Sequence, residues 1–129
     1  MSKDSTVRAM HDRIRLIYHQ GKQILFVDLS NCPANEVEKI ARAAPDYITV
    51  KPRGSVLVLT DFTGATFDRD ALRAMKETAV FDKPFVKKSA LIGTENFPRE
   101  FYKELTSYSR RELLIFKTRE EALAWLVGD

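Results

Sequence analysis

Two short segments of the sequence share a pattern of side chains that could do acid–base or metal chemistry. In each, an apolar run is followed by an aspartate, an apolar residue and a hydroxyl: VDLSN contains Asp28, and TDFTG contains Asp61. If the two runs are neighbouring strands, both aspartates lie at one edge of a sheet, where a carboxylate pair can transfer protons or hold Mg²⁺. The alternative, which we favour, is that each aspartate forms an Asx-type turn with the groups that follow it.

The single cysteine and the two histidines offer little further chemistry. Cys32 precedes Pro33 near the start of a predicted helix, where the helix dipole lowers the pKa of a thiol. A nucleophilic thiol needs a base, however, and the predicted elements place neither His11 nor His19 beside it. We therefore expect an inert, partly buried cysteine, with no zinc site, no other metal and no cofactor.

Glycine and threonine residues follow two of the predicted strands. Gly64 and Thr66 come shortly after Asp61, and Gly93 and Thr94 follow a later apolar run. Backbone amides at such turns before a helix can hold an anion, so the two segments together predict a small polar crevice. The simpler interpretation is that the glycines let the chain turn sharply. Neither GxGxxG nor GxxxxGK[ST] occurs, so no dinucleotide site or P-loop is predicted.

The composition is typical of a globular protein. The 129 residues are 44% hydrophobic and 30% charged, with a formal net charge of +3. No run approaches the ~18 apolar residues of a membrane span, and the first residues lack the apolar stretch of a secretory signal. The basic residues are scattered along the chain, so nucleic-acid binding is not expected. We expect one cytoplasmic domain over residues 13–129, after a loose lead-in over residues 1–12.

Alternating and continuous apolar segments predict five strands. Residues 13–20 alternate like a half-buried strand, and a QGK turn leads to a return strand at 24–28 whose continuous apolar character predicts burial on both faces. SVLVLTD, residues 55–61, is the clearest strand and should be central. Two more strands are predicted within FVKKSALIG at 85–93 and RELLIFK at 111–117.

Apolar residues at helical spacing predict four helices. The first covers residues 34–44, and the segment 45–50 after it fits either a helix or a strand. The second begins after the N-cap Asp68 and runs to about residue 80. The third lies within TENFPREFYKELTSYS at 94–109, and the last begins with a capping box formed by Thr118 and Glu121.

The third helical segment is rich in aromatic residues, namely Phe97, Phe101, Tyr102 and Tyr108. Part of this set should pack on the sheet. Phe97 and Tyr102 point away from the Phe101 stripe, so an exposed apolar patch that favours dimerisation or a hydrophobic ligand groove is left open as an alternative.

The order of these elements predicts a mixed α/β sheet. Strands separated by single helices pair in parallel, whereas the opening hairpin makes the first strand antiparallel. The prediction is a five-stranded sheet covered by about four helices. The residues that follow the parallel strands then fall at one end of the sheet, where a ligand or a partner would bind.

The element order and the segment LVLTDFTGATFD resemble the STAS domain, the fold of bacterial anti-sigma-factor antagonists, and more closely the SpoIIAA-like family. The resemblance covers residues 13–127. In the antagonists the strand ends in an aspartate, a hydrophobic residue, a serine or threonine and a small residue, which Asp61, Phe62, Thr63 and Gly64 match. The resemblance implies a regulatory module of STAS-like fold that binds proteins.

The chain departs from the antagonist pattern just after this match. The antagonists continue with an aspartate, two serines and a glycine, and a partner kinase phosphorylates one serine; here the chain has Phe67, Asp68, Arg69 and Asp70. Because no hydroxyl stands at the matching position, the usual phosphorylation switch is not expected. Asp68 supplies a permanent charge there or is simply an N-cap, and Thr63 and Thr66 remain as acceptors in principle.

The residues and the resemblance together predict a non-enzymatic binding or regulatory module that acts through a protein partner. The expected contact residues lie at the strand ends: Asp61, Thr63, Gly64, Thr66, Asp68, Gly93 and Thr94. An alternative is a carrier or sensor of an anionic or lipid-like small molecule, which would use the crevice at the same end. A homodimer is left open, and an enzyme built on Asp28 and Asp61 is a third hypothesis.

Overall fold

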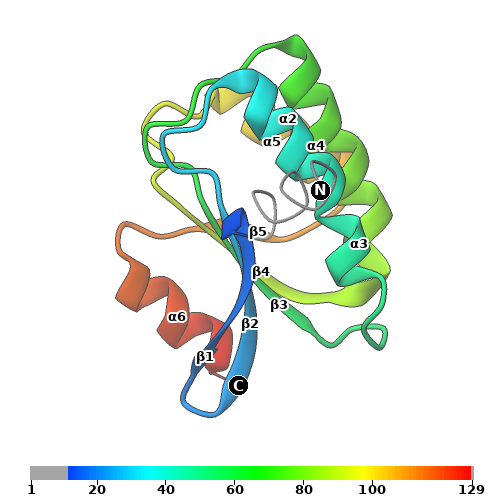
Figure 1. Ribbon diagram of the computed structural model, residues 1–129, viewed down its shortest axis with the longest axis vertical. Helices are drawn as coiled ribbons and strands as arrows, with labels where there is room; N and C mark the ends of the chain where they lie inside the picture. Colours follow the sequence, from blue (N-terminus) through cyan, green and yellow to red (C-terminus); the bar gives the residue numbers. More distant parts are fainter. Residues whose placement is uncertain (1–11, 129) are drawn as a thin grey trace, which may run out of the picture.

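The computed structural model describes residues 12–128 and contains one five-stranded sheet (Figure 1). The strands are neighbours in the order in which they follow one another along the chain. The first pair is antiparallel and the remaining pairs are parallel, which confirms the predicted mixed sheet with its central third strand. The strands are β1 (Ile14–His19), β2 (Lys22–Asp28), β3 (Val56–Asp61), β4 (Val86–Ile92) and β5 (Leu113–Ile115).

The helices cover the two faces of the sheet unequally. Figure 1 shows α6 (Arg119–Val127) on one face and the other helices on the opposite face. The connections between successive parallel strands are all crossovers of the same hand. Because these strands are added to the sheet in chain order, their helices all lie on the same face. The helices on that side are α2 (Ala34–Ala43), α3 (Pro45–Ile48), α4 (Arg69–Asp82) and α5 (Arg99–Ser109).

Each face of the sheet has its own apolar core. Along β2, Leu25 and Val27 point to the four-helix side, whereas Ile24 and Phe26 point to α6. All four side chains are buried, as the continuous apolar run predicts for a strand covered on both faces. The α6 side is the smaller core and includes Leu126, which is 1% exposed.

Local capping signals set the starts of two helices as predicted. The Asp68 carboxylate accepts a hydrogen bond from the Ala71 N–H at 2.8 Å and caps α4. The Thr118 hydroxyl oxygen accepts from the Glu121 N–H at 3.2 Å and caps α6. The α4 helix continues two residues beyond its predicted end, to Asp82, before the short 3₁₀ turn η1 (Lys83–Phe85).

Three further details refine the predicted elements. The segment after α2, which fitted either a helix or a strand, is the helix α3. Ile48 lies at helical spacing in the sequence, and its side chain is buried at 3% exposed. The last strand is only three residues long, shorter than the apolar segment suggested. The predicted lead-in lies outside the described residues except at Asp12. None of the helices within residues 12–128 is long and apolar enough to cross a membrane.

Candidate functional site

The parallel register brings three strand ends together. Asp28 at the end of β2 pairs with Asp61 at the end of β3, and Asp61 pairs with Ile92 at the end of β4. Backbone hydrogen bonds continue beyond the strands, from Leu29 N–H to Asp61 O and from Phe62 N–H to Ile92 O, each at 2.9 Å. The loops after β2, β3 and β4 therefore form one continuous edge, at the upper left of Figure 1.

Asp28 and Asp61 make the same local turn. The Asp61 Oδ1 accepts from the Thr63 N–H at 2.9 Å and from the Thr63 hydroxyl at 2.6 Å. The Asp28 Oδ1 accepts from the Ser30 N–H at 3.0 Å and from the Ser30 hydroxyl at 2.6 Å. These contacts confirm the Asx-type turns predicted from the repeated sequence pattern.

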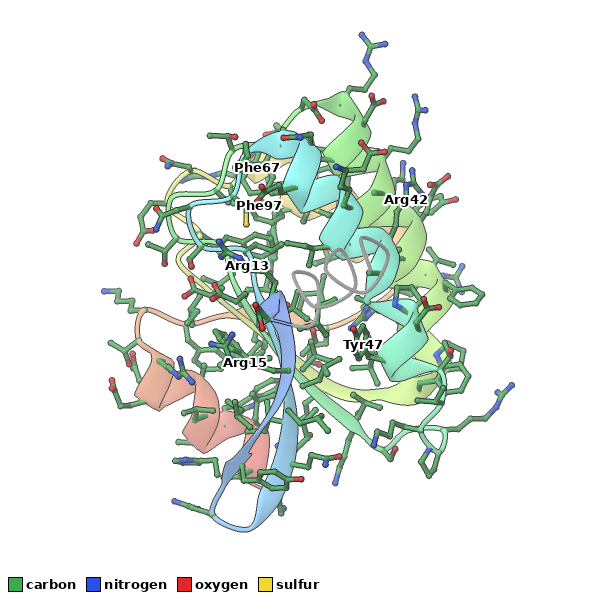
Figure 2. The ribbon with its side chains drawn as sticks, viewed as in Figure 1. Arg13, Arg15, Arg42, Tyr47, Phe67 and Phe97 are labelled. Atoms are coloured by element: carbon green, nitrogen blue, oxygen red, sulfur yellow. The ribbon has the colours of Figure 1, made fainter. Side chains whose placement is uncertain are left out.

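The two aspartates are neighbours, but their surroundings differ. Arg13 and Arg15 lie 3.7 and 4.0 Å from the Asp28 carboxylate, and Arg13 also donates to the Ser30 carbonyl at 2.9 Å (Figure 2). Each carboxylate is thus held by its own local donors instead of sharing a proton with the other. Among the residues that the structure describes, no group of three His, Cys, Asp or Glu side chains is arranged to hold a metal ion.

The crevice expected between the loops after β3 and β4 is closed by direct contact. Gly93 has φ +67°, and a Cβ there would lie 2.5 Å from the Thr63 nitrogen and 2.8 Å from the Asp61 Oδ1. Gly64 has φ +71° and packs in the same way on the Asn31 side chain. Both positions need glycine because the backbone is left-handed and neighbouring atoms leave no room for a Cβ. The interpretation that these glycines let the chain turn sharply is therefore confirmed.

A larger hollow lies at the opposite end of the sheet. It has a volume of about 460 Å³ and is bordered by Leu16, Tyr47 and Leu57, among others. Because it lies near the starts of β2 and β3, it is far from the strand ends where a ligand crevice was predicted. The carrier alternative placed its ligand at the other end, where Gly93 and Thr63 are in direct contact.

The predicted contact residues form an exposed polar surface, which we call the strand-end surface: Asp61, Thr63, Gly64, Thr66, Asp68, Gly93 and Thr94. Thr63, Gly64, Thr66 and Asp68 are exposed, and the other three are half-buried. The Thr66 N–H donates to the Cys32 carbonyl at 3.0 Å, and the Thr94 carbonyl accepts from the Phe97 N–H at 3.0 Å. These bonds fix the backbone and leave the Thr66 side chain facing solvent.

Aromatic rings pack beneath the strand-end surface. The rings of Phe62 and Phe97 are stacked with centroids 4.8 Å apart, and Phe67 lies 5.3 Å from Phe97 (Figure 2). The alternative of an exposed patch that includes Phe97 and Tyr102 is not supported, because Phe97 is buried and the Tyr102 hydroxyl donates to the Leu113 carbonyl. Of the aromatic set on this segment, Tyr108 is the exposed member.

Cys32 does not have the properties of a reactive thiol. It is 1% exposed, and burial is the largest cause of a pKa raised above the ordinary thiol value. A raised pKa keeps the thiol protonated and weakly nucleophilic. The expectation of an inert cysteine is confirmed, and the opposite effect of the helix dipole is outweighed.

The sequence did not reveal a buried polar group on the four-helix side of the sheet. Asp82 is 4% exposed, and its Oδ1 has no hydrogen-bond partner. Burial raises its pKa to about 6, partly offset by the positive charge of Arg111. Burial likewise lowers the pKa of Arg111, which donates to the Ala79 carbonyl at 3.3 Å. The sequence feature that could have indicated it is an aspartate at the C-terminal end of a helix, where the helix dipole disfavours a negative charge.

A comparison with solved structures gives a match for this fold. No protein-family model matches the chain, and no curated protein sequence does. The crystal structure of an uncharacterised protein of the DUF3478 family from Shewanella loihica PV-4, described as having a SpoIIAA-like fold, matches with a TM-score of 0.68. The match covers 88% of this chain and 91% of that one at 16% sequence identity. The chain therefore has the SpoIIAA-like α/β fold that the sequence resemblance implied.

Proposed function

We propose that the protein is a non-enzymatic binding module and that the strand-end surface is its contact with a protein partner. The observation that carries this proposal is the combination of exposed side chains with a fixed backbone. Thr63, Thr66 and Asp68 face solvent, while hydrogen bonds tie their loop to the loop after β2 and to the last residue of β4. A surface whose backbone is already ordered loses less entropy when a partner binds.

The contacts of the carboxylates argue against catalysis at this surface. Asp28 is engaged by Ser30 and two arginines, Asp61 by Thr63, and Asp68 by the first turn of α4. A general acid or base has to exchange its proton with a substrate placed within hydrogen-bond reach. Carboxylates that accept local backbone N–H groups instead define the shape and charge of a surface.

The Asp68 cap also bears on regulation. Its carboxylate stands at the helix N-terminus where the resembling antagonists are switched by a phosphoserine, and it accepts the Ala71 N–H at 2.8 Å. This N-cap contact, worth about 1 kcal/mol, accounts for an aspartate at this position without a switch. We infer that partner binding is constitutive here, or is controlled elsewhere than at the usual serine position.

The proposal is tested by placing a bulky charge on the strand-end surface. Thr66→Arg changes an exposed side chain whose structural bond is made by its backbone N–H, so the fold should persist. Ser107→Arg, on an exposed position near the other end of α5, is the matched control. Tagged variants expressed in the native host are compared by quantitative mass spectrometry of the proteins that co-purify.

We expect a defined partner to co-purify with the unmodified protein and with Ser107→Arg, and to fall at least about tenfold with Thr66→Arg, as for a clash at the centre of an interface. Circular dichroism checks that both variants are folded. Retention of the same partner by Thr66→Arg would move the contact away from the strand-end surface.

A further inference from the structure

A second hollow lies at the end of the sheet opposite the strand-end surface. It has a volume of about 150 Å³ and lies where η1 enters β4 and where the chain enters β5. Its border includes Lys83, Lys87, Arg110 and Arg111, together with the hydroxyl residue Ser89 and one acidic residue, Glu112.

Three of the basic residues around this hollow lack acidic partners, whereas Arg111 has the Asp82 carboxylate as a neighbouring charge. Within residues 12–128, none of Lys83, Lys87, Arg110 and Arg111 has an ion pair within 4.0 Å, whereas Arg13, Arg42 and Lys76 all do. Lys88 also borders the hollow, but its ammonium group donates to the carbonyls of Trp125 and Gly128 on the α6 side. Four cations therefore face the Glu112 carboxylate and the buried Asp82 behind Arg111, which leaves the hollow with a net positive potential.

Arg111 is the half-buried member of these four cations and borders the hollow. It also borders a neighbouring hollow of about 100 Å³ that is lined by Asp82, so Arg111 lies between the two hollows. A guanidinium has five N–H donors. Among the described residues the Arg111 side chain makes one hydrogen bond, to the Ala79 carbonyl at 3.3 Å. The remaining N–H groups can be offered to a ligand in the fork geometry that suits an oxyanion.

Ser89 adds a neutral donor beside Arg111. Ser89 is 4% exposed and borders both of these hollows. Its hydroxyl makes no hydrogen bond with another described residue. A hydroxyl, a desolvated guanidinium and flexible lysines are the groups that bind phosphate in proteins.

We propose that this hollow binds a phosphate-type oxyanion, either inorganic phosphate or the head of a small phosphomonoester. Arg111 and Ser89 would hold its oxygens, and Lys83, Lys87 and Arg110 would neutralise its charge. The dianionic form of a phosphomonoester carries about two negative charges, which suits a hollow with several unpaired cations. The volume of about 150 Å³ accommodates a tetrahedral oxyanion and leaves the rest of a larger ligand outside. The site is separate from the strand-end surface and does not depend on its role.

The proposal is tested by calorimetric titration of the intact protein with inorganic phosphate, at an ionic strength held constant with sodium chloride. The site variant Lys83→Gln/Lys87→Gln removes two exposed cations from the hollow. The control variant Lys39→Gln/Lys103→Gln removes two exposed cations from α2 and α5, so both proteins have the same net charge.

We expect saturable binding with one phosphate per chain, weakened at least about tenfold in the site variant and changed less than about twofold in the control. Absence of saturable binding to the unmodified protein, or equal weakening in both variants, would overturn the proposal. Flotation with phosphatidylcholine vesicles containing phosphatidic acid separates the possible sources of the phosphate group. Binding to these vesicles without binding of free phosphate or glycerol phosphate would overturn the assignment to a small soluble oxyanion.

Discussion

At the scale of single residues, aspartate takes three different roles in this chain. Asp28 and Asp61 shape turns, Asp68 caps a helix, and Asp82 is buried with an oxygen that has no partner. The turn and cap roles follow from local sequence, because each of these aspartates contacts a group two or three residues further along the chain. The role of Asp82 depends on what packs over the end of α4, which local sequence does not contain.

Substitution of Gly93 tests the contact between the loops after β3 and β4. Gly93→Ala places a Cβ against the Thr63 nitrogen and the Asp61 carboxylate in left-handed backbone, and we expect a loss of about 3 kcal/mol or more in the free energy of unfolding. Gly54 has the same φ of +67° with no atom near the added Cβ, so Gly54→Ala should cost only about 1–2 kcal/mol. Equal losses in chemical denaturation would contradict the close contact.

Substitution of Asp82 tests its burial. A folded-state pKa of about 6, above the ordinary 3.8, means that the folded protein binds more protons between these pH values than the unfolded chain. The contribution of Asp82 to stability is therefore fully present below about pH 3.8 and is lost as pH rises through about 6, by up to about 3 kcal/mol. Asp82→Asn should unfold with higher free energy at pH 7.5 and lose this part of the pH dependence.

The control for this experiment is Asp70→Asn. Asp70 is exposed in the first turn of α4, where a negative charge is favourable, so its loss should lower stability by a few tenths of a kcal/mol. Denaturant titrations from pH 4 to 8 compare the three proteins. An Asp82→Asn protein that is less stable than the unmodified protein at pH 7.5 would show that the ionised carboxylate is satisfied.

At the scale of elements, α6 depends on side chains from outside its own sequence. The Lys88 ammonium donates to the carbonyls of Trp125 at 2.8 Å and Gly128 at 2.6 Å, and lies 5.0 Å from the Trp125 ring centroid. Lys22 donates to the Val127 carbonyl at 2.9 Å. Cations at a helix C-terminus satisfy its free carbonyl groups and complement its dipole. The capping box at Thr118 was predictable, whereas these C-terminal contacts require the sheet to be in place.

Removal of the Lys88 charge should loosen α6 selectively. For Lys88→Gln we expect a loss of about 1–2 kcal/mol in the free energy of unfolding and faster amide exchange in α6 than in α4. Lys87→Gln, at the exposed neighbouring position, should change stability by less than about 0.5 kcal/mol. Uniform acceleration of exchange across the protein would argue that α6 has no separate dependence on Lys88.

At the scale of the whole molecule, the sequence predicted the elements and the pairing of the strands better than the placement of the helices. Strand types, hairpin and caps follow from local patterns such as the alternating β1 and the continuous apolar β3. The face that α6 covers depends on the order of the strands in the sheet. The other helices lie together on the opposite face because strands that follow one another in the chain are also neighbours in the sheet. The closed contact at Gly93 and the cluster of Asp82 with Arg111 join residues from different elements, so they required the assembled fold.

Site-specific photo-crosslinking in the native host tests most directly whether the strand-end surface binds a protein partner. A photoreactive amino acid at Thr66 lies on the strand-end surface, and the same amino acid at Ser107 lies near the other end of α5. We expect a discrete crosslinked protein from position 66 that is absent from position 107. A crosslink to the same protein from position 107 alone would contradict the assignment of the strand-end surface as the binding site.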